Sequence, residues 1–81
     1  MVKMIPERSV FIERDKNGKE HFRAELLADY SSDLVDLTEL NGRIFEPGSV
    51  CLCGKEPEIC VLMFDSKWYK QSTGTEVTAN A

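Results

Sequence analysis

Long apolar runs and a surplus of positive charge are both missing from this sequence of 81 residues. No segment approaches the ~18 consecutive apolar residues that a membrane-spanning helix needs, and the N-terminus lacks the apolar stretch of a secretory signal. Ten basic against 14 acidic residues give a net charge of −4, which disfavours binding to nucleic-acid phosphates. We therefore expect a soluble protein, cytoplasmic when made, that binds neither membranes nor nucleic acid.

Motifs for catalysis are missing as well. The sequence has no glycine-rich phosphate loop, no Cys-x-x-Cys pair and no His-x-x-x-His pair. Its single histidine, His21, falls among carboxylates on an expected open sheet face, where acid–base catalysis gains little. We therefore predict that the protein is not an enzyme and has no cofactor, and we interpret His21 as a solvent-facing residue beside a carboxylate.

Three cysteines, Cys51, Cys53 and Cys60, lie within ten residues. An odd number of cysteines without a secretory signal indicates reduced thiols rather than disulfides. A zinc site is the alternative, but the usual knuckle spacing is absent and a fourth ligand would have to be His21. We predict that the three side chains are buried as small apolar groups and bind no metal.

The length allows one small domain. Two cores would leave each half near the ~40 residues below which folding without assistance fails. We place the domain at residues 1–71 and expect residues 72–81, which are small and polar with no apolar period, to form a flexible tail. A domain of this size leaves roughly two-fifths of its chain surface exposed, so a partner subunit would add stability.

Residues 9–27 have the pattern of an N-terminal β-hairpin. Two segments rich in β-branched and aromatic residues flank the turn sequence Asp15-Lys16-Asn17-Gly18. A two-residue turn at Asn17-Gly18 would place like charges opposite each other, whereas a three-residue loop with a left-handed Gly18 avoids this. The expected cross-strand pairs are Arg14–Glu20, Glu13–His21, Ile12–Phe22 and Val10–Ala24.

The segment 31–41 supports two interpretations. It begins with residues that cap helices, carries Leu34 and Leu37 at helical spacing, and ends in Asn41-Gly42, which is typical of a helix C-terminus. These features predict a helix of one to two turns that leans on the sheet. An ordered loop with a few apolar anchors fits the same residues.

Residues 49–71 have the pattern of a C-terminal antiparallel meander. Two apolar runs, 49–53 and 59–64, are separated by turn residues, and Asp65-Ser66 offers a tight turn into a third strand. That turn sets Trp68 opposite Met63 and Tyr69 opposite Leu62. The whole chain is therefore expected to be mostly β, a small single domain of β-hairpins with one short helix or ordered loop.

The two longer strands of this meander are apolar on both faces. The first hairpin and the segment 31–41 can cover one of these faces. We expect the other to contact another protein molecule, because aromatic and aliphatic side chains are favoured where an interface is desolvated. The residues predicted to form this interface are Val50, Leu52, Leu62, Phe64, Trp68 and Tyr69.

Residues 45–53 and 59–70 resemble a module of small structural proteins of tailed bacteriophages and prophages. In that module Pro-Gly-Ser opens a strand, a short turn follows, and an apolar strand ends in a polar turn before a tryptophan. Here Pro47-Gly48-Ser49 and Asp65-Ser66-Lys67-Trp68 carry the likeness, and 37–42 is similar to the usual lead-in. The turn at 54–58 departs from the commoner Thr- or Asp-rich turn, which leaves the subfamily open. The resemblance implies an oligomeric virion component and supplies no catalytic residues.

Two functions follow from these observations. The first is a phage or prophage virion structural or accessory protein (decoration, fibre or tail-associated) that acts through protein–protein contacts, including self-association. The alternative is a small intracellular adaptor or regulatory protein that binds one protein partner. Stoichiometry distinguishes them, because a virion part should self-associate whereas an adaptor should be monomeric alone.

Overall fold

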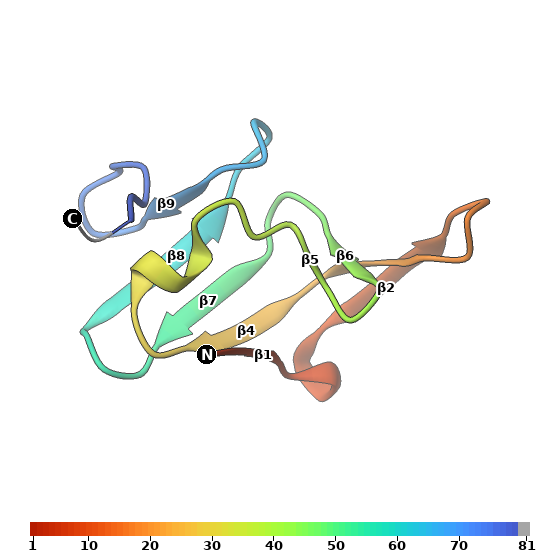
Figure 1. Ribbon diagram of the computed structural model, residues 1–81, viewed down its shortest axis with the longest axis horizontal. Coiled ribbons are helices and arrows are strands. Elements are labelled where there is room, and N and C mark those ends of the chain that lie inside the picture. Colours follow the sequence, from red (N-terminus) through yellow and green to blue (C-terminus); the bar gives the residue numbers. More distant parts are fainter. Residues whose placement is uncertain (80–81) are drawn as a thin grey trace.

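Two β-sheets make up the fold, and the chain passes from one to the other (Figure 1). The computed structural model describes residues 1–79. One sheet has the strand order β1-β4-β7-β8-β9 and the other the order β2-β3-β6-β5. The strands are β1 (Val2–Met4), β2 (Val10–Arg14), β3 (Glu20–Arg23), β4 (Glu25–Ala28), β5 (Glu39–Leu40), β6 (Arg43–Phe45), β7 (Val50–Cys53), β8 (Glu58–Leu62) and β9 (Trp68–Lys70). Two 3-10 helices, η1 (Pro6–Arg8) and η2 (Ser31–Leu34), complete the elements. The mostly β fold class is confirmed.

The hairpin of β2 and β3 has the predicted loop. Gly18 adopts a φ of 83°, and Asp15 donates its backbone N–H to the Lys19 carbonyl at 2.9 Å, so three residues form the loop. The pairs Arg14–Glu20 and Glu13–His21 are confirmed. This hairpin projects from one end of the molecule (Figure 1), and all five residues of β2 are exposed.

On the N-terminal side of Glu13, the register of β2 against β3 differs from the predicted one. A bulge between Phe11 and Glu13 leaves Ile12 without a cross-strand partner, so Phe11 lies opposite Phe22 and Val10 opposite Arg23. The predicted pairs Ile12–Phe22 and Val10–Ala24 are therefore wrong. The bulge brings the Phe11 and Phe22 rings into an edge-to-face contact with centroids 5.6 Å apart, which is a favoured aromatic geometry.

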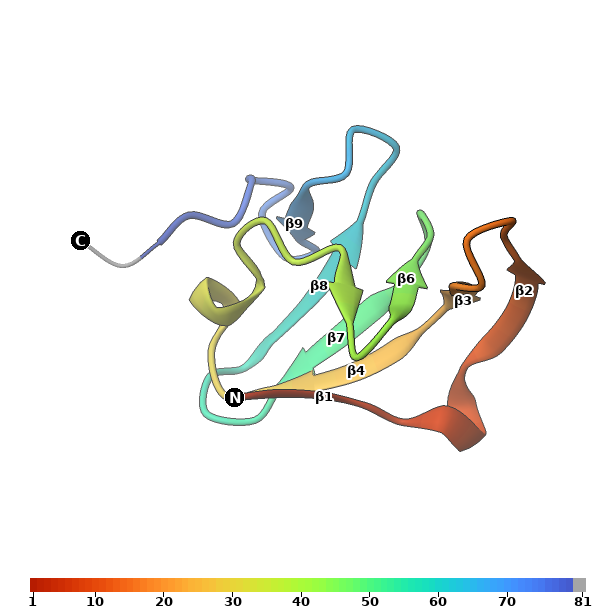
Figure 2. The ribbon, with the colours of Figure 1, turned by 45° about the vertical axis from the view of Figure 1, so that its right-hand side comes forward.

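Strands β3 and β4 are nearly continuous, and Ala24 between them marks the passage from the four-stranded to the five-stranded sheet (Figure 2). The later segment β6–β7 runs parallel to both strands, with Phe22 opposite Phe45 and Glu25 opposite Val50. Between these two pairs the β6–β7 segment has four residues, 46–49, whereas the β3–β4 segment has only two, Arg23 and Ala24. Those four form a turn with Pro47 second and Gly48 third at a φ of 96°, the pattern of a type II turn.

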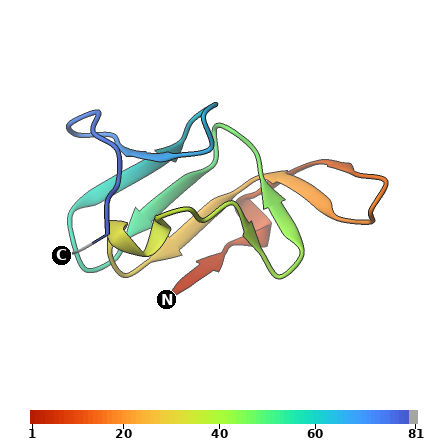
Figure 3. The same ribbon diagram turned by 45° about the horizontal axis from the view of Figure 1, so that its top comes forward.

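The segment 31–41 contains a short helix, as one of the two interpretations predicts, in the form of the 3-10 helix η2, and it also contains strand β5, which neither interpretation predicts. Asn41 and Gly42 have φ values of 54° and 79°, and they connect β5 to β6 with Leu40 opposite Arg43. This is a two-residue hairpin turn, so the predicted helix C-cap at these residues is wrong. Helix η2 lies over the five-stranded sheet (Figure 2, Figure 3), where it contacts β4 and β8.

The C-terminal meander is present, but its last register differs by one residue from the prediction. Met63 donates its backbone N–H to the Lys67 carbonyl at 3.0 Å, so the loop has three residues and Ser66 takes a φ of 64°. Trp68 therefore lies opposite Leu62 and not Met63, and Tyr69 lies opposite Val61 and not Leu62. Because the register shifts by one residue, the Trp68 side chain points to the core face of the sheet.

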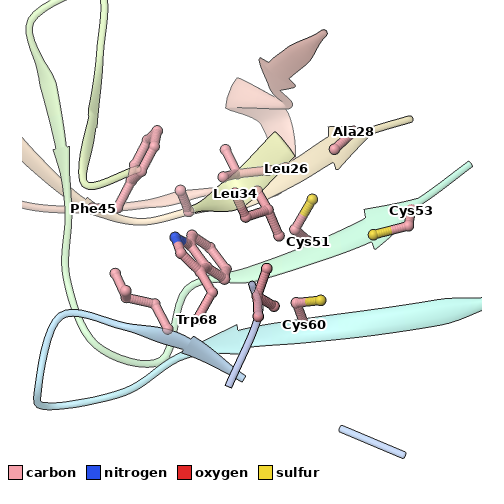
Figure 4. Packing of buried hydrophobic residues seen from close by; sticks show 11 residues of the cluster. Leu26, Ala28, Leu34, Phe45, Cys51, Cys53, Cys60 and Trp68 are labelled. Atoms are coloured by element: carbon pink, nitrogen blue, oxygen red, sulfur yellow. The ribbon is translucent and has the colours of Figure 1, made fainter. Parts of the chain in front are cut away.

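The core lies between η2, the β6 end of the four-stranded sheet and one face of the five-stranded sheet. Figure 4 shows side chains from these elements meeting around Trp68, which is 2% exposed and donates its indole N–H to the Leu37 carbonyl at 2.7 Å. The buried apolar residues are Ala24, Leu26, Ala28, Leu34, Phe45, Cys51, Cys53, Cys60, Leu62, Trp68 and Val77.

Val77 ties the C-terminal segment to this core. Its side chain is buried, and its backbone N–H donates to the Trp68 carbonyl at 2.8 Å. Glu76 forms an isolated bridge with Tyr69. The prediction that residues 72–81 form a flexible tail is therefore wrong for these two residues, and residues 80–81 lie outside the described part of the chain.

Candidate protein-interaction surface

The strands of the five-stranded sheet alternate between two faces. Leu26, Cys51, Cys60, Leu62 and Trp68 point to the face that packs against η2, and all five are buried. We call this the inner face. The residues between them point to the opposite side, which we call the outer face, because successive side chains of a strand point to opposite sides of a sheet.

The outer face carries seven uncharged and largely apolar side chains. Leu27, Leu52 and Ile59 form one row across β4, β7 and β8. Val50 and Val61 lie in the next row, which continues to Tyr69 on β9. The exposed fractions are 50% for Leu52, 42% for Ile59 and 45% for Met63, which follows β8. The set is Leu27, Val50, Leu52, Ile59, Val61, Met63 and Tyr69.

Charged groups stand beside this apolar band. Glu25, in the row of Val50, pairs with Arg8 at 3.0 Å. Lys3 lies opposite Leu27 on the edge strand β1. At the other edge the Tyr69 hydroxyl donates to Asp65 Oδ2 at 2.6 Å, which raises the pKa of Tyr69 and lowers the pKa of Asp65. An apolar centre with a polar rim is the usual anatomy of a protein interface.

An open hollow of about 500 Å³ extends the outer face toward the C-terminal segment. Val61, Met63 and Tyr69 form its apolar floor, and Asp65, Gln71 and Gly74 are among the residues around it. The hollow joins the outer face to the loop between β8 and β9, where the side chain of Phe64 is 92% exposed. The apolar surface is therefore larger than the sheet face itself.

The predicted interface residues divide between this surface and the core. Val50, Leu52 and Tyr69 lie on the outer face, and Phe64 lies in the adjoining loop. Leu62 and Trp68 are 1% and 2% exposed, so these two are corrected to core residues.

Sequence reasoning left Leu27, Ile59, Val61 and Met63 out of the interface. The alternation of Ile59, Val61 and Met63 with Cys60 and Leu62 is visible in the sequence. It shows which side chains share a face, but not that Val61 lies opposite Val50, and that register decides which set accompanies Val50 and Leu52.

The three cysteines lie on the inner face. All three are free thiols and buried, so the predicted burial is confirmed. Cys51 and Cys60 are directly opposite each other on β7 and β8. Desolvation is the main cause that raises the pKa of each of these two thiols to about 12, so both stay protonated and unreactive at neutral pH. Within residues 1–79 no group of three or more His, Cys, Asp or Glu side chains is arranged to hold a metal ion.

His21 is less open than the sequence suggests. Its side chain is 17% exposed, and its ring contacts Asp15 and Glu46 rather than its cross-strand neighbour Glu13. The Glu46 hydrogen bond first and the Asp15 hydrogen bond second raise the pKa of His21. The interpretation of His21 as a solvent-facing residue is therefore wrong. The expected neighbouring carboxylate is present, and there are two of them, Asp15 and Glu46.

Comparison of the chain with protein-family models, with curated proteins and with solved structures finds no match. Neither 3-10 helix of residues 1–79 has the length and apolarity that crossing a membrane requires.

Proposed function

We propose that this protein is a non-enzymatic structural or accessory component that acts through protein–protein contacts, with the outer face as its contact surface. The observation that carries the proposal is the row Leu27–Leu52–Ile59, three aliphatic side chains side by side on a sheet face whose opposite side already packs the core. A sheet that packs the core with one face and meets water with the other normally places polar side chains on the solvated face. A continuous apolar band there is typical of an interaction site.

The partner we propose is a second copy of this chain. The seven side chains of the apolar band are uncharged, and the charged side chains of the same rows, Glu25 and Lys3, lie at its border. Two bands can therefore meet without burying a charge that lacks a partner. Glu25 already pairs with Arg8 at the rim, and Tyr69 with Asp65. A face of this kind is complementary to itself, as an isologous interface requires.

The size of the face predicts the strength of the contact. Five strands ~4.8 Å apart and about four residues long give a flat area of roughly 300 Å². Two such faces bury roughly 600 Å², below the ~1,200 Å² at the low end of stable interfaces. The hollow and Phe64 add to this area, but a single pair of copies should still associate weakly. Such a contact becomes effective when many copies are held together, as in a virion.

The sequence resemblance to small structural proteins of tailed phages supports the same proposal. It favours a decoration, fibre or tail-associated role in which copies of the chain meet each other or neighbouring virion proteins. The alternative, a small intracellular adaptor, would use the same outer face for one different partner and would be monomeric alone.

A pair of matched variants tests the role of the outer face. Leu52→Lys places a charge in the centre of the band, and Val10→Lys places the same charge on β2 of the other sheet, where Val10 is equally exposed (51% against 50%). Sedimentation velocity over a range of concentrations should show association of the wild type and of Val10→Lys, with at least a tenfold loss of affinity for Leu52→Lys. Equal behaviour of the two variants would contradict the assignment of the outer face.

A further inference from the structure

His21 lies between two carboxylates, and each carboxylate contacts a different nitrogen of the ring. Nδ1 is 2.5 Å from Glu46 Oε2, and Nε2 is 2.9 Å from Asp15 Oδ2. A neutral imidazole has one N–H and one lone pair, so it can donate a hydrogen bond to only one of them. The doubly protonated imidazolium donates to both, and the observed arrangement therefore fits the charged ring.

The three residues come from separate parts of the fold. His21 is on β3, Asp15 opens the loop of the projecting hairpin, and Glu46 opens the turn at which the later segment changes sheets. We propose that His21 is a pH-sensitive clamp, which joins the hairpin loop to the 46–49 turn when it is protonated and releases the Glu46 side chain when it is neutral. This device is independent of the outer face and goes beyond the contact function.

Glu46 is the partner that is released. Asp15 is held in place without His21, because its Oδ1 accepts the backbone N–H groups of Asn17 and Lys19 at 2.9 and 3.0 Å. Glu46 reaches the ring with a longer side chain that is 36% exposed. The clamp requires the neutral ring to keep its proton on Nε2, toward the anchored Asp15, so that the lone pair on Nδ1 faces the Glu46 carboxylate and repels it.

Other charges around the ring do not replace this clamp. Glu13 lies directly opposite His21 on β2 without a hydrogen bond to it, and the Lys19 ammonium is engaged by Glu39 at 2.8 Å. The remaining charged groups on the elements beside His21 are Arg14 on β2, Glu20 and Arg23 on β3, and Arg43 on β6. Arg14 pairs with Glu20 at 3.1 Å.

The sign of the pH effect follows from the raised pKa of His21. In the unfolded chain a histidine has a pKa of about 6.5, so the folded state holds the proton more tightly than the unfolded state. The stabilisation by the clamp is complete below the unfolded pKa and is lost as the pH rises through the folded pKa.

An NMR titration tests the clamp, and the single histidine makes the ring signals unambiguous. Between about pH 5 and about pH 9 the wild-type ring should titrate above about 6.5, and the backbone amide signals of Glu46, Gly48 and Ser49 should shift with the same midpoint. The amides of Asn17 and Lys19 should change less, because Asp15 stays anchored. A wild-type ring that titrates at its ordinary pKa, or turn amides that do not follow it, would overturn the proposal.

Three nearly isosteric variants separate hydrogen bonding from charge. Asp15→Asn and Glu46→Gln should each lower the pKa of His21, and Glu46→Gln should also abolish the pH response of the turn. Glu13→Gln removes a neighbouring carboxylate that makes no hydrogen bond to the ring, so it should lower the pKa less than the other two. An equal shift of the His21 pKa in all three variants would show that the ring responds only to the overall negative charge around it, and would overturn the clamp. The wild-type titration decides independently if a variant does not fold.

Discussion

The hydroxyl oxygen of Ser49 lies 2.9 Å from the backbone nitrogen of Ala24, a residue 25 positions earlier in the chain. Ala24 is the residue at which the first segment passes between the sheets, and Ser49 ends the turn that carries the second segment through the same passage. The hydroxyl in turn donates to the Glu46 carbonyl at 2.8 Å, and Ser49 is fully buried. One side chain thus joins the two passages.

Replacing Ser49 by alanine should destabilise the protein. The Ala24 N–H would lose its acceptor inside the core, and a buried donor without a partner costs about 1–3 kcal/mol. Chemical denaturation followed by the fluorescence of the single tryptophan, Trp68, measures this loss in the free energy of unfolding.

Ser72→Ala is the matched control for that measurement. The Ser72 hydroxyl donates to Glu58 at 2.8 Å, but the pair is exposed, so its loss should change the free energy of unfolding by less than ~0.5 kcal/mol. If Ser49→Ala cost no more than Ser72→Ala, the buried hydroxyl would not be what joins the passages.

Gly18→Ala should lower the free energy of unfolding by about 1–2 kcal/mol, because the added Cβ must adopt the left-handed φ of 83°. Nothing lies within 4 Å of that Cβ, so backbone strain is the only cost. Gly54→Ala serves as the comparison, since its φ is not in the left-handed region and its Cβ would sit 3.6 Å from the Ala28 carbonyl, an ordinary contact. Equal stability changes at the two positions would argue against strain in the loop.

The thiols of Cys51, Cys53 and Cys60 should resist alkylation in the folded protein and react fully after unfolding. With a pKa of about 12 for Cys51 and Cys60, only about one thiol in ten thousand is ionised at pH 8. Native mass spectrometry should give the unmodified mass, and denatured protein should gain three adducts. Rapid labelling of the native state, or a stoichiometric zinc adduct, would refute this.

The two Asn-Gly pairs show what local sequence can and cannot specify. At Asn17-Gly18 the charges on the flanking strands select the three-residue loop, and the structure has that loop. At Asn41-Gly42 the sequence fits a helix end as well as a hairpin turn. The decision falls to the parallel pairing of β6 with β3, which brings together residues 23 positions apart. Local patterns do not contain such a pairing.

The same limit applies to the candidate surface. Period-two alternation in residues 59–63 separates two sets of side chains. The length of the loop at 64–66 decides which of Trp68 and Tyr69 on β9 shares a face with each set, and a difference of one residue exchanges the two. The predicted register pairs Trp68 with Met63, whereas in the structure Trp68 lies opposite Leu62 and in the core. The role of Ser49 was equally hidden, because its main partner is distant in sequence and its own neighbourhood resembles an ordinary strand start.

The mass of the wild-type protein in solution, measured by light scattering over a wide range of concentrations, tests the central claim most directly. If the outer face joins copies of this chain, the mean mass should rise above that of the monomer as concentration increases, and Leu52→Lys should keep it at the monomer value. A wild type that remains monomeric at every concentration would contradict self-association through Leu27, Leu52 and Ile59.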